Sequence, residues 1–274
     1  MDYFLGAVIP YTACMVFIFG TALRVVSWLK APVPFHLTLF PAPIGAMGRI
    51  RAIFADVLLC GSLFREDKAL WLRVWLFHFS FALIIAGHIA GIYYLRDQFV
   101  LIGLTHEASH TLSRFSGAIA GVIITISLLL LLWGRLANPI VRKLSVPEDF
   151  FTLLLLISIA VTGILMHLPG FRVNISEVRS FMGRLIFFEP SALPRSPMFI
   201  AHFLLVNLLL IYFPFSRLLH SVGYFVNRVM LTEAAPIYPT PATKTLRSPF
   251  AEVKAEPDAS LSRRETLDRE ALHP

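Results

Sequence analysis

The chain has 274 residues, of which 57% are hydrophobic and only 15% are charged. This balance is typical of a membrane protein and excludes an ordinary soluble domain. We interpret the formal net charge of +7 as a sign of membrane topology, because no motif typical of nucleic-acid-binding proteins is present.

Five apolar stretches are each long enough to cross a bilayer as a helix, which takes about 20 residues. The first has neither a basic leading region nor a small-residue cleavage site, so we expect a retained span rather than a signal peptide. The expected fold is an all-α membrane protein, a bundle of five transmembrane helices. The predicted spans cover residues 3–28, 70–95, 115–133, 150–168 and 198–219.

The connector between the first two spans, residues 31–68, starts with prolines that cannot continue a helix. From about Ile44 to Phe64 it mixes apolar and charged residues, which indicates a helix in the membrane interface or a docking surface for a partner. A short helix is expected over residues 178–188. Residues 231–274 are rich in Pro, Glu, Lys, Arg and Ser, so we expect an extended polar tail after a membrane domain of residues 1–230.

The loop expected after the second span carries His106, Glu107 and His110. The spacing of the two histidines would put both rings on one helical face, where they could bind a metal ion. The chain has only two cysteines and no obvious third ligand, so we favour a role in proton handling.

Basic residues gather after the first span, after the third span and at the end of the fifth. Because cytoplasmic loops carry an excess of Lys and Arg, this pattern predicts an N-terminus outside and a C-terminus in the cytoplasm. The loop after the fourth span departs from the pattern, since it also holds arginines that glutamates offset only in part.

Two of the spans carry two histidines each, His78 and His88 in the second and His202 and His220 in the fifth. An ionisable side chain in such a segment is costly, so each is a candidate functional residue. If the two helices run antiparallel, His78 faces His220 near one membrane surface and His88 faces His202 near the other. Imidazole is a standard axial ligand of haem iron, so two bis-histidine haems would explain all four residues.

The axial distances between the histidines on the two helices do not match. The step from His202 to His220 is about five turns and about 27 Å, whereas the step from His78 to His88 is about 15 Å. Helix tilt and a kink at Pro214 would absorb the difference and leave the two irons roughly 20 Å apart.

Three alternatives stay open. Each histidine could be a core residue that bonds nearby backbone. A proton-translocating or ion-translocating transporter could use the histidines as a relay, but it would also need acidic residues in mid-membrane, and the spans lack them. A non-redox membrane anchor is the third alternative.

The segment Phe213–His220 and the pairs Phe77-His78 and Gly87-His88 resemble the gamma (cytochrome b) subunit family of respiratory nitrate reductase. The start of the chain, Ile9-Pro10-Tyr11, is also similar, so the resemblance covers residues 3–230. The connector at residues 31–35 looks more like the related membrane subunit of sulfite-reduction complexes. In those complexes a cytoplasmic iron–sulfur subunit related to heterodisulfide reductase replaces the molybdoenzyme.

The resemblance implies two b haems. His78 and His220 would hold one toward the cytoplasm, and His88 and His202 would hold the other toward the outside. It also implies a quinol pocket by the outer haem, for menaquinone or ubiquinone. The family has a lysine at this pocket, but Ser109 or His110 stands at that place here.

The implied function is electron exchange between the quinone pool and a cytoplasmic partner, either an iron–sulfur (heterodisulfide-reductase-like) subunit or a molybdoenzyme. Haem propionates need cations, and arginines lie near the span ends. Protons from quinol would leave through histidines or Glu107, because histidine titrates near neutral pH. The candidates are Arg73, Arg114 and Arg217 for the propionates, and His106, Glu107, His110 and His167 for the protons.

Overall fold

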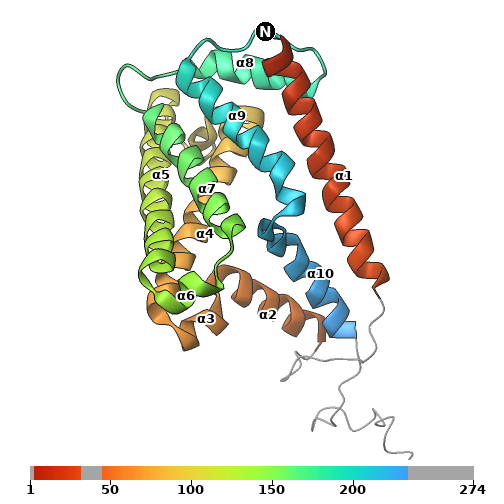
Figure 1. Cartoon of the computed structure of the whole chain (residues 1–274). Coiled ribbons are helices and arrows are strands. Elements are labelled where there is room, and N and C mark those ends of the chain that lie inside the picture. The colour runs from red at the N-terminus through yellow and green to blue at the C-terminus, as the bar shows by residue number, and fades with distance from the viewer. Residues whose placement is uncertain (1–2, 32–44, 234–274) are drawn as a thin grey trace, which may run out of the picture. The chain divides into compact units, whose positions relative to one another are not determined.

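The structure is a computed structural model that describes residues 3–31 and 45–233 (Figure 1). All regular structure in these ranges is helical, and five helical segments are long and apolar enough to span a membrane, as predicted. The chain divides into two compact units. The first comprises residues 1–31 and 50–226 and contains the candidate spans. The second, residues 32–49 and 227–274, is described only at residues 45–49 and 227–233.

The first span joins a π-helical turn, η1 (Phe4–Val8), to α1 (Ile9–Lys30). The connector contains α2 (Gly45–Leu59), as expected, and α3 (Gly61–Glu66). Residues 32–44 of the connector and the predicted tail after residue 233 lie outside the described residues. The second span joins α4 (Lys68–His88) to the π-helical η2 (Ile89–Tyr94).

The third span, α5 (His106–Ala137), follows the 3-10 turn η3 (Gln98–Ile102) and begins earlier than predicted. The Thr105 hydroxyl accepts a hydrogen bond from the Ala108 N–H, and Glu107 lies in the first turn, where a negative charge favours the helix. The prediction of a loop at His106 and His110 was therefore wrong, because both residues are helical.

The short helix α6 (Pro139–Leu144) leads into the fourth span, α7 (Pro147–Leu165). α8 (Ile175–Ile186) is the short helix predicted over residues 178–188, and the fifth span begins with α9 (Pro197–Tyr212). α8 is amphipathic and packs its apolar face against α9. The buried side chains of this cluster are Val178, Phe181, Leu185, Leu193, Phe199 and Phe203.

The fifth span was predicted to run as one kinked helix to residue 219, and this was wrong. α9 stops at Tyr212, and Pro214, which has no N–H to donate, lies in the 3-10 turn η4 (Phe213–Phe215). Ser216 is extended, with φ −106° and ψ 168°. A second 3-10 turn, η5 (Arg217–Leu219), leads into α10 (His220–Glu233), so the expected five turns between His202 and His220 are interrupted.

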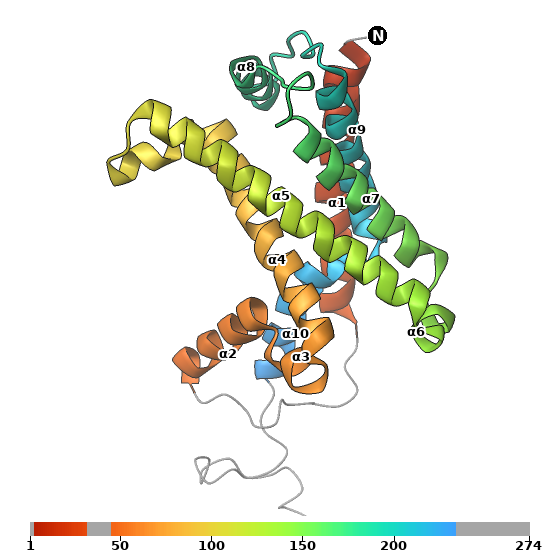
Figure 2. The ribbon, with the colours of Figure 1, turned by 90° about the vertical axis from the view of Figure 1, so that its left-hand side faces the viewer.

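The spans form a chain of packed neighbours. α4 packs on α5, α5 on α7, α7 on α9 and α9 on α1 (Figures 1 and 2). α4 and α9 are thus joined through α5 and α7 rather than by a comparable interface of their own. Large apolar side chains point outward along the spans, such as Phe19 (58% exposed) and Leu154 (53% exposed), which suits a surface that faces lipid.

Candidate functional site

The structure brings together the histidines that were expected to pair. The ring centres of His78 and His220 are 6.2 Å apart, and those of His88 and His202 are 6.5 Å apart. We call the first pair site A and the second pair site B. The ring planes are nearly perpendicular in site A, at 88°, and nearly parallel in site B, at 19°.

All four imidazoles share one hydrogen-bonding pattern, in which Nδ1 lies within hydrogen-bonding distance of a backbone carbonyl. A carbonyl only accepts, so Nδ1 carries the proton and the lone pair of Nε2 is free to bind a metal. The His202 Nδ1 also lies 3.0 Å from the Thr162 hydroxyl. The acceptors are Val74 O for His78 (2.8 Å), Ile84 O for His88 (2.8 Å), Ile159 O for His202 (3.0 Å) and Arg217 O for His220 (2.9 Å).

The spacing of the rings fits a pair of axial ligands. Two metal–imidazole bonds of about 2 Å each, plus half of each ring, put the ring centres roughly 6 Å apart. Among the described residues no group of three or more His, Cys, Asp or Glu could hold a bare metal ion. Two imidazoles are, however, a sufficient protein contribution for haem, since the macrocycle supplies the remaining nitrogens. Sites A and B therefore fit this cofactor.

The His202 ring of site B is packed closely against Gly163. A Cβ atom placed on Gly163 of α7 would lie 3.3 Å from His202 Cε1, which is tighter than almost all real contacts. Gly163 therefore lets α7 approach α9 closely enough for the Ile159 carbonyl and the Thr162 hydroxyl to reach the ring.

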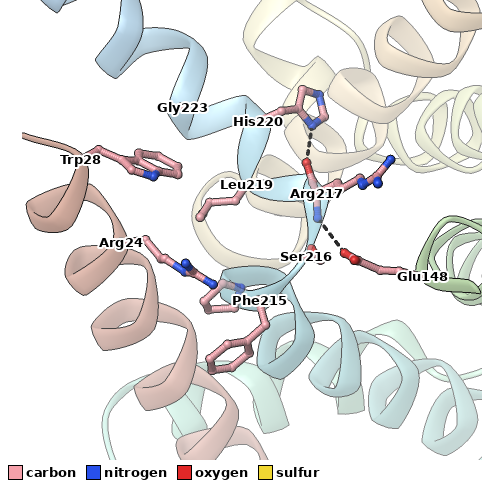
Figure 3. A pocket seen from close by; sticks show the side chains of 10 residues that line it. Arg24, Trp28, Glu148, Phe215, Ser216, Arg217, Leu219, His220 and Gly223 are labelled. Atoms are coloured by element: carbon pink, nitrogen blue, oxygen red, sulfur yellow. Dashed lines mark hydrogen bonds between the residues drawn. The ribbon is translucent and has the colours of Figure 1, made fainter. Parts of the chain in front are cut away.

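A cavity of about 380 Å³ opens beside His220 of site A (Figure 3). Arg24 and Trp28 of α1 line one side of it, and η4 and η5 line the other. Arg217 also lines the cavity, but its guanidinium pairs with Asp149 at 3.1 Å. Arg24 is thus a cation beside site A that the sequence reasoning did not select, although its place near the end of a span could have suggested it.

The other arginines predicted to meet propionates lie in different surroundings. Arg73 donates from Nε to the Ala69 carbonyl at 3.0 Å and from Nη1 to the Leu130 carbonyl at 3.4 Å. It lies against Gly134 of α5, where an added Cβ would come within 2.9 Å of Nη1. Arg114 is exposed, and its charge acts on His167 near site B.

A polar network joins the end of the second span to α8. His106 donates to the Asp97 carboxylate at 2.8 Å, and Arg179 of α8 donates to the carbonyl of Gly91 at 2.9 Å and to that of Arg96. The hydrogen bond from His106 and the nearby charge of Arg179 hold the pKa of Asp97 below its usual value. His106 thus pairs with a loop carboxylate.

The residues predicted to handle protons lie on the outer face of α5. His106, Glu107 and His110 are all exposed, whereas Ser109 is buried and accepts a hydrogen bond from the Phe99 N–H. This difference in exposure follows from the early start of α5, because the helical conformation turns Ser109 inward and its neighbours outward. Their role stays a prediction.

His167, just after α7, is a more enclosed candidate. Its ring lies against Gly117 of α5, where an added Cβ would be 3.7 Å from Cε1. Burial lowers the pKa of His167, and the charges of Arg114 and His88 lower it further. Three buried polar atoms lack a hydrogen-bond partner among the described residues, and two of them, Gln98 Oε1 and Ser113 Oγ, belong to η3 and to α5. The sequence offered no signal for these two.

The family model described as nitrate reductase gamma subunit matches residues 36–234. The chain belongs to the nitrate reductase gamma subunit family. This confirms the resemblance predicted from the residues around His78, His88 and His220. With its five apolar helices, this member of the family is a multi-pass membrane protein.

Curated relatives agree with this family. The Hdr-like menaquinol oxidoreductase cytochrome b-like subunit of Archaeoglobus fulgidus is 28% identical over 257 residues, covering 81% of this chain and 77% of that protein. The subunit of the same name from Archaeoglobus profundus is 26% identical, covering 80% and 76%. The nitrate reductase gamma chain of Bacillus subtilis is 27% identical, covering 57% of this chain and 73% of that one.

Proposed function

We propose that this chain is the cytochrome b subunit of a respiratory electron-transfer complex in a prokaryotic cytoplasmic membrane. It carries electrons between a quinone and a partner subunit through two b haems, one at site A and one at site B. The observation that carries the proposal is the pair of facing imidazoles at each site, every one of them with Nδ1 bonded to a carbonyl. The names of the relatives, cytochrome b-like subunit and nitrate reductase gamma chain, support it.

The chain's own residues hold and orient the cofactors. His78 and His220 at site A, and His88 and His202 at site B, would supply Nε2 to the two irons, while the backbone carbonyls fix the ring orientations. A bound haem supplies a centre that takes up and releases one electron at a time inside the low-dielectric bundle. The cavity lined by Arg24 and Arg217 offers cations to the propionates at site A.

Quinol oxidation is assigned to the end of the bundle with site B. A quinol releases two electrons and two protons, so the site needs a neutral base. The lowered pKa of His167 keeps its ring neutral and able to accept a proton. Ser113 and Gln98 can bond the quinol oxygens, and His106, Glu107 and His110 can pass protons to the exterior. Menaquinone is favoured over ubiquinone, because the Archaeoglobus relatives are named as menaquinol oxidoreductase subunits.

The electrons leave at site A for a cytoplasmic partner. The excess of basic residues at this end of the bundle supports the cytoplasmic orientation. The names of the relatives favour an iron–sulfur subunit of the heterodisulfide-reductase-like type over a molybdoenzyme. The connector helices and the tail after residue 230 are the proposed docking region.

A haem assay tests the proposal. The full chain, produced with ample haem and purified, is expected to show a b-type spectrum on reduction with dithionite and two haems per chain by pyridine haemochrome assay. Addition of a menaquinol analogue should reduce these haems. A colourless protein would instead favour a transporter or a non-redox anchor, and a coloured protein with one haem per chain would contradict the two-site assignment.

A further inference from the structure

His220 differs from the other three histidines in how its carbonyl acceptor is held. Val74 and Ile84 lie in α4 and Ile159 lies in α7, so their carbonyls are fixed by regular helix. The acceptor of His220 is the Arg217 carbonyl, which lies in a three-residue 3-10 turn after the extended Ser216. The Ser216 hydroxyl caps this turn by accepting from the Leu218 N–H, and the turn also receives contacts from outside its own helix.

These contacts come from the first turn of α7 (Figure 3). The Arg217 N–H donates to Glu148 Oε1 at 3.1 Å. The Arg217 guanidinium pairs with the Asp149 carboxylate, with Nη1 at 3.1 Å from Oδ1 and 3.4 Å from Oδ2. Arg217 is thus held by its backbone and by its side chain, and its carbonyl in turn holds His220.

Asp149 is a buried carboxylate, so its ion pair with Arg217 is not an ordinary surface ion pair. Its side chain is only 5% exposed, whereas that of Arg217 is 62% exposed. The carboxylate also accepts from the Val146 N–H at 3.1 Å and lies 3.5 Å from Arg135 of α5. A buried carboxylate that lost these partners would be costly, so Asp149 fixes the ends of α5 and α7 and the turn before His220 to one another.

The two sites also differ in the angle between their ring planes. The imidazoles cross at 88° in site A and at 19° in site B. The angle between two axial imidazoles sets the splitting of the iron d orbitals, so crossed rings give ferric haem a larger maximum g value than parallel rings. Sites A and B should therefore be distinguishable by electron paramagnetic resonance.

Resting on the proposed function, we propose that Asp149 is a positioning residue for the haem at site A. By holding Arg217 it keeps the His220 ring crossed against His78, and it places a buried negative charge next to the arginine at that site. Asp149 touches neither the iron nor a ligand ring; it acts through Arg217.

The test compares Asp149→Asn with the unchanged protein, both as full chains loaded with haem. The site A signal should lose its large maximum g value, and the midpoint potential of that haem should rise because a negative charge is removed. Arg217→Gln should also move the signal but lower the potential, because a positive charge is removed. The site B signal and potential should stay unchanged in both, and Asp149→Glu should restore the site A signal in part.

Glu66→Gln is the matched control, since it removes an exposed negative charge of α3 at the same end of the bundle. It should leave both signals in place. If Asp149→Asn fails to accumulate, Glu148→Gln takes its place and should shift the site A signal alone. An unshifted site A signal in the variant that is measured, or equal shifts at both sites, overturns the inference. Absence of haem from the unchanged protein would instead refute the proposed function.

Discussion

Single residues decide how closely the ligands of site B are held. The His202 Nδ1 lies 3.0 Å from both the Ile159 carbonyl and the Thr162 hydroxyl, two groups of the neighbouring helix α7. Gly163 makes this approach possible, because its missing side chain leaves room for the ring. The sequence could identify His202 as a candidate haem ligand. It could not reveal the contribution of Gly163, since that depends on which helix packs beside α9.

Gly163→Ala should weaken the haem at site B. The added methyl group would lie 3.3 Å from the His202 ring, so the ring or the helix must shift. The haem content after purification is expected to fall from two toward one per chain. Gly87→Ala is the control, because nothing lies within 4 Å of its added Cβ, and it should keep both haems. Equal retention in the two variants would contradict this role of Gly163.

His167 should impose an acid limit on quinol oxidation. Burial lowers its pKa below the usual value of 6.5, so the ring is mostly neutral at pH 7 and becomes protonated as the pH falls through this lowered pKa. The rate of haem reduction by quinol should therefore decline on acidification through that pKa. His167→Gln should lower the rate at pH 7 by about 100-fold, the lower end of the effect of a general base. It should also remove the decline of the rate at acidic pH. Stopped-flow reduction across pH 5–8, at roughly the titration range of histidine, measures both.

The presence of each helix was easier to predict from the sequence than the residues at which it begins and ends. The five spans were expected from their apolar runs, a short helix was expected over residues 178–188, and each is present. The start of α5 was missed because its first turns are polar and carry the N-terminal signal of Thr105 and Glu107 rather than apolar residues. The break after α9 was underestimated, because Pro214 alone predicts a kink and the extended Ser216 has no mark in the sequence.

α8 contributes to stability through one deeply buried ring. Phe181 is 1% exposed and contacts Phe199 and Phe203 of α9. Phe181→Ala should destabilise the protein by about 3–5 kcal/mol, the usual cost of removing a buried phenylalanine ring. Thermal unfolding in one detergent measures this as a lowered Tm. Phe187→Ala, at a ring that is 77% exposed, should leave the Tm nearly unchanged, and a similar loss in both variants would argue against this packing.

At the scale of the whole molecule, the pairing of the histidines followed from the antiparallel order of the second and fifth spans. Consecutive spans alternate in direction, so the two spans between them leave this pair antiparallel. The sequence could therefore indicate which imidazoles meet. It could not give the ring angles or the route by which site A is anchored to α7, because Glu148 and Arg217 are 69 positions apart in the chain. Contacts of this kind depend on the fold and not on local pattern.

The two sites should be separable by mutation, since they share no histidine and no acceptor carbonyl. His88→Ala is expected to remove the site B haem and keep the site A haem, and His78→Ala is expected to do the reverse. Haem content should be one per chain in both variants, with different remaining spectra. Loss of both haems from a variant that still elutes as a folded protein would show that the pairing is wrong.

The cross-helix bond of His202 has a mechanical consequence. Its acceptor belongs to α7 while the ring belongs to α9, so any sliding of one helix past the other pulls directly on an iron ligand. In His78 and His88 the ring and its acceptor travel together on α4 and are shielded from such movement. Bilayer thickness changes helix tilt. It should therefore change the absorption spectrum and the midpoint potential of the haem at site B by moving His202, while His88 keeps its position relative to α4.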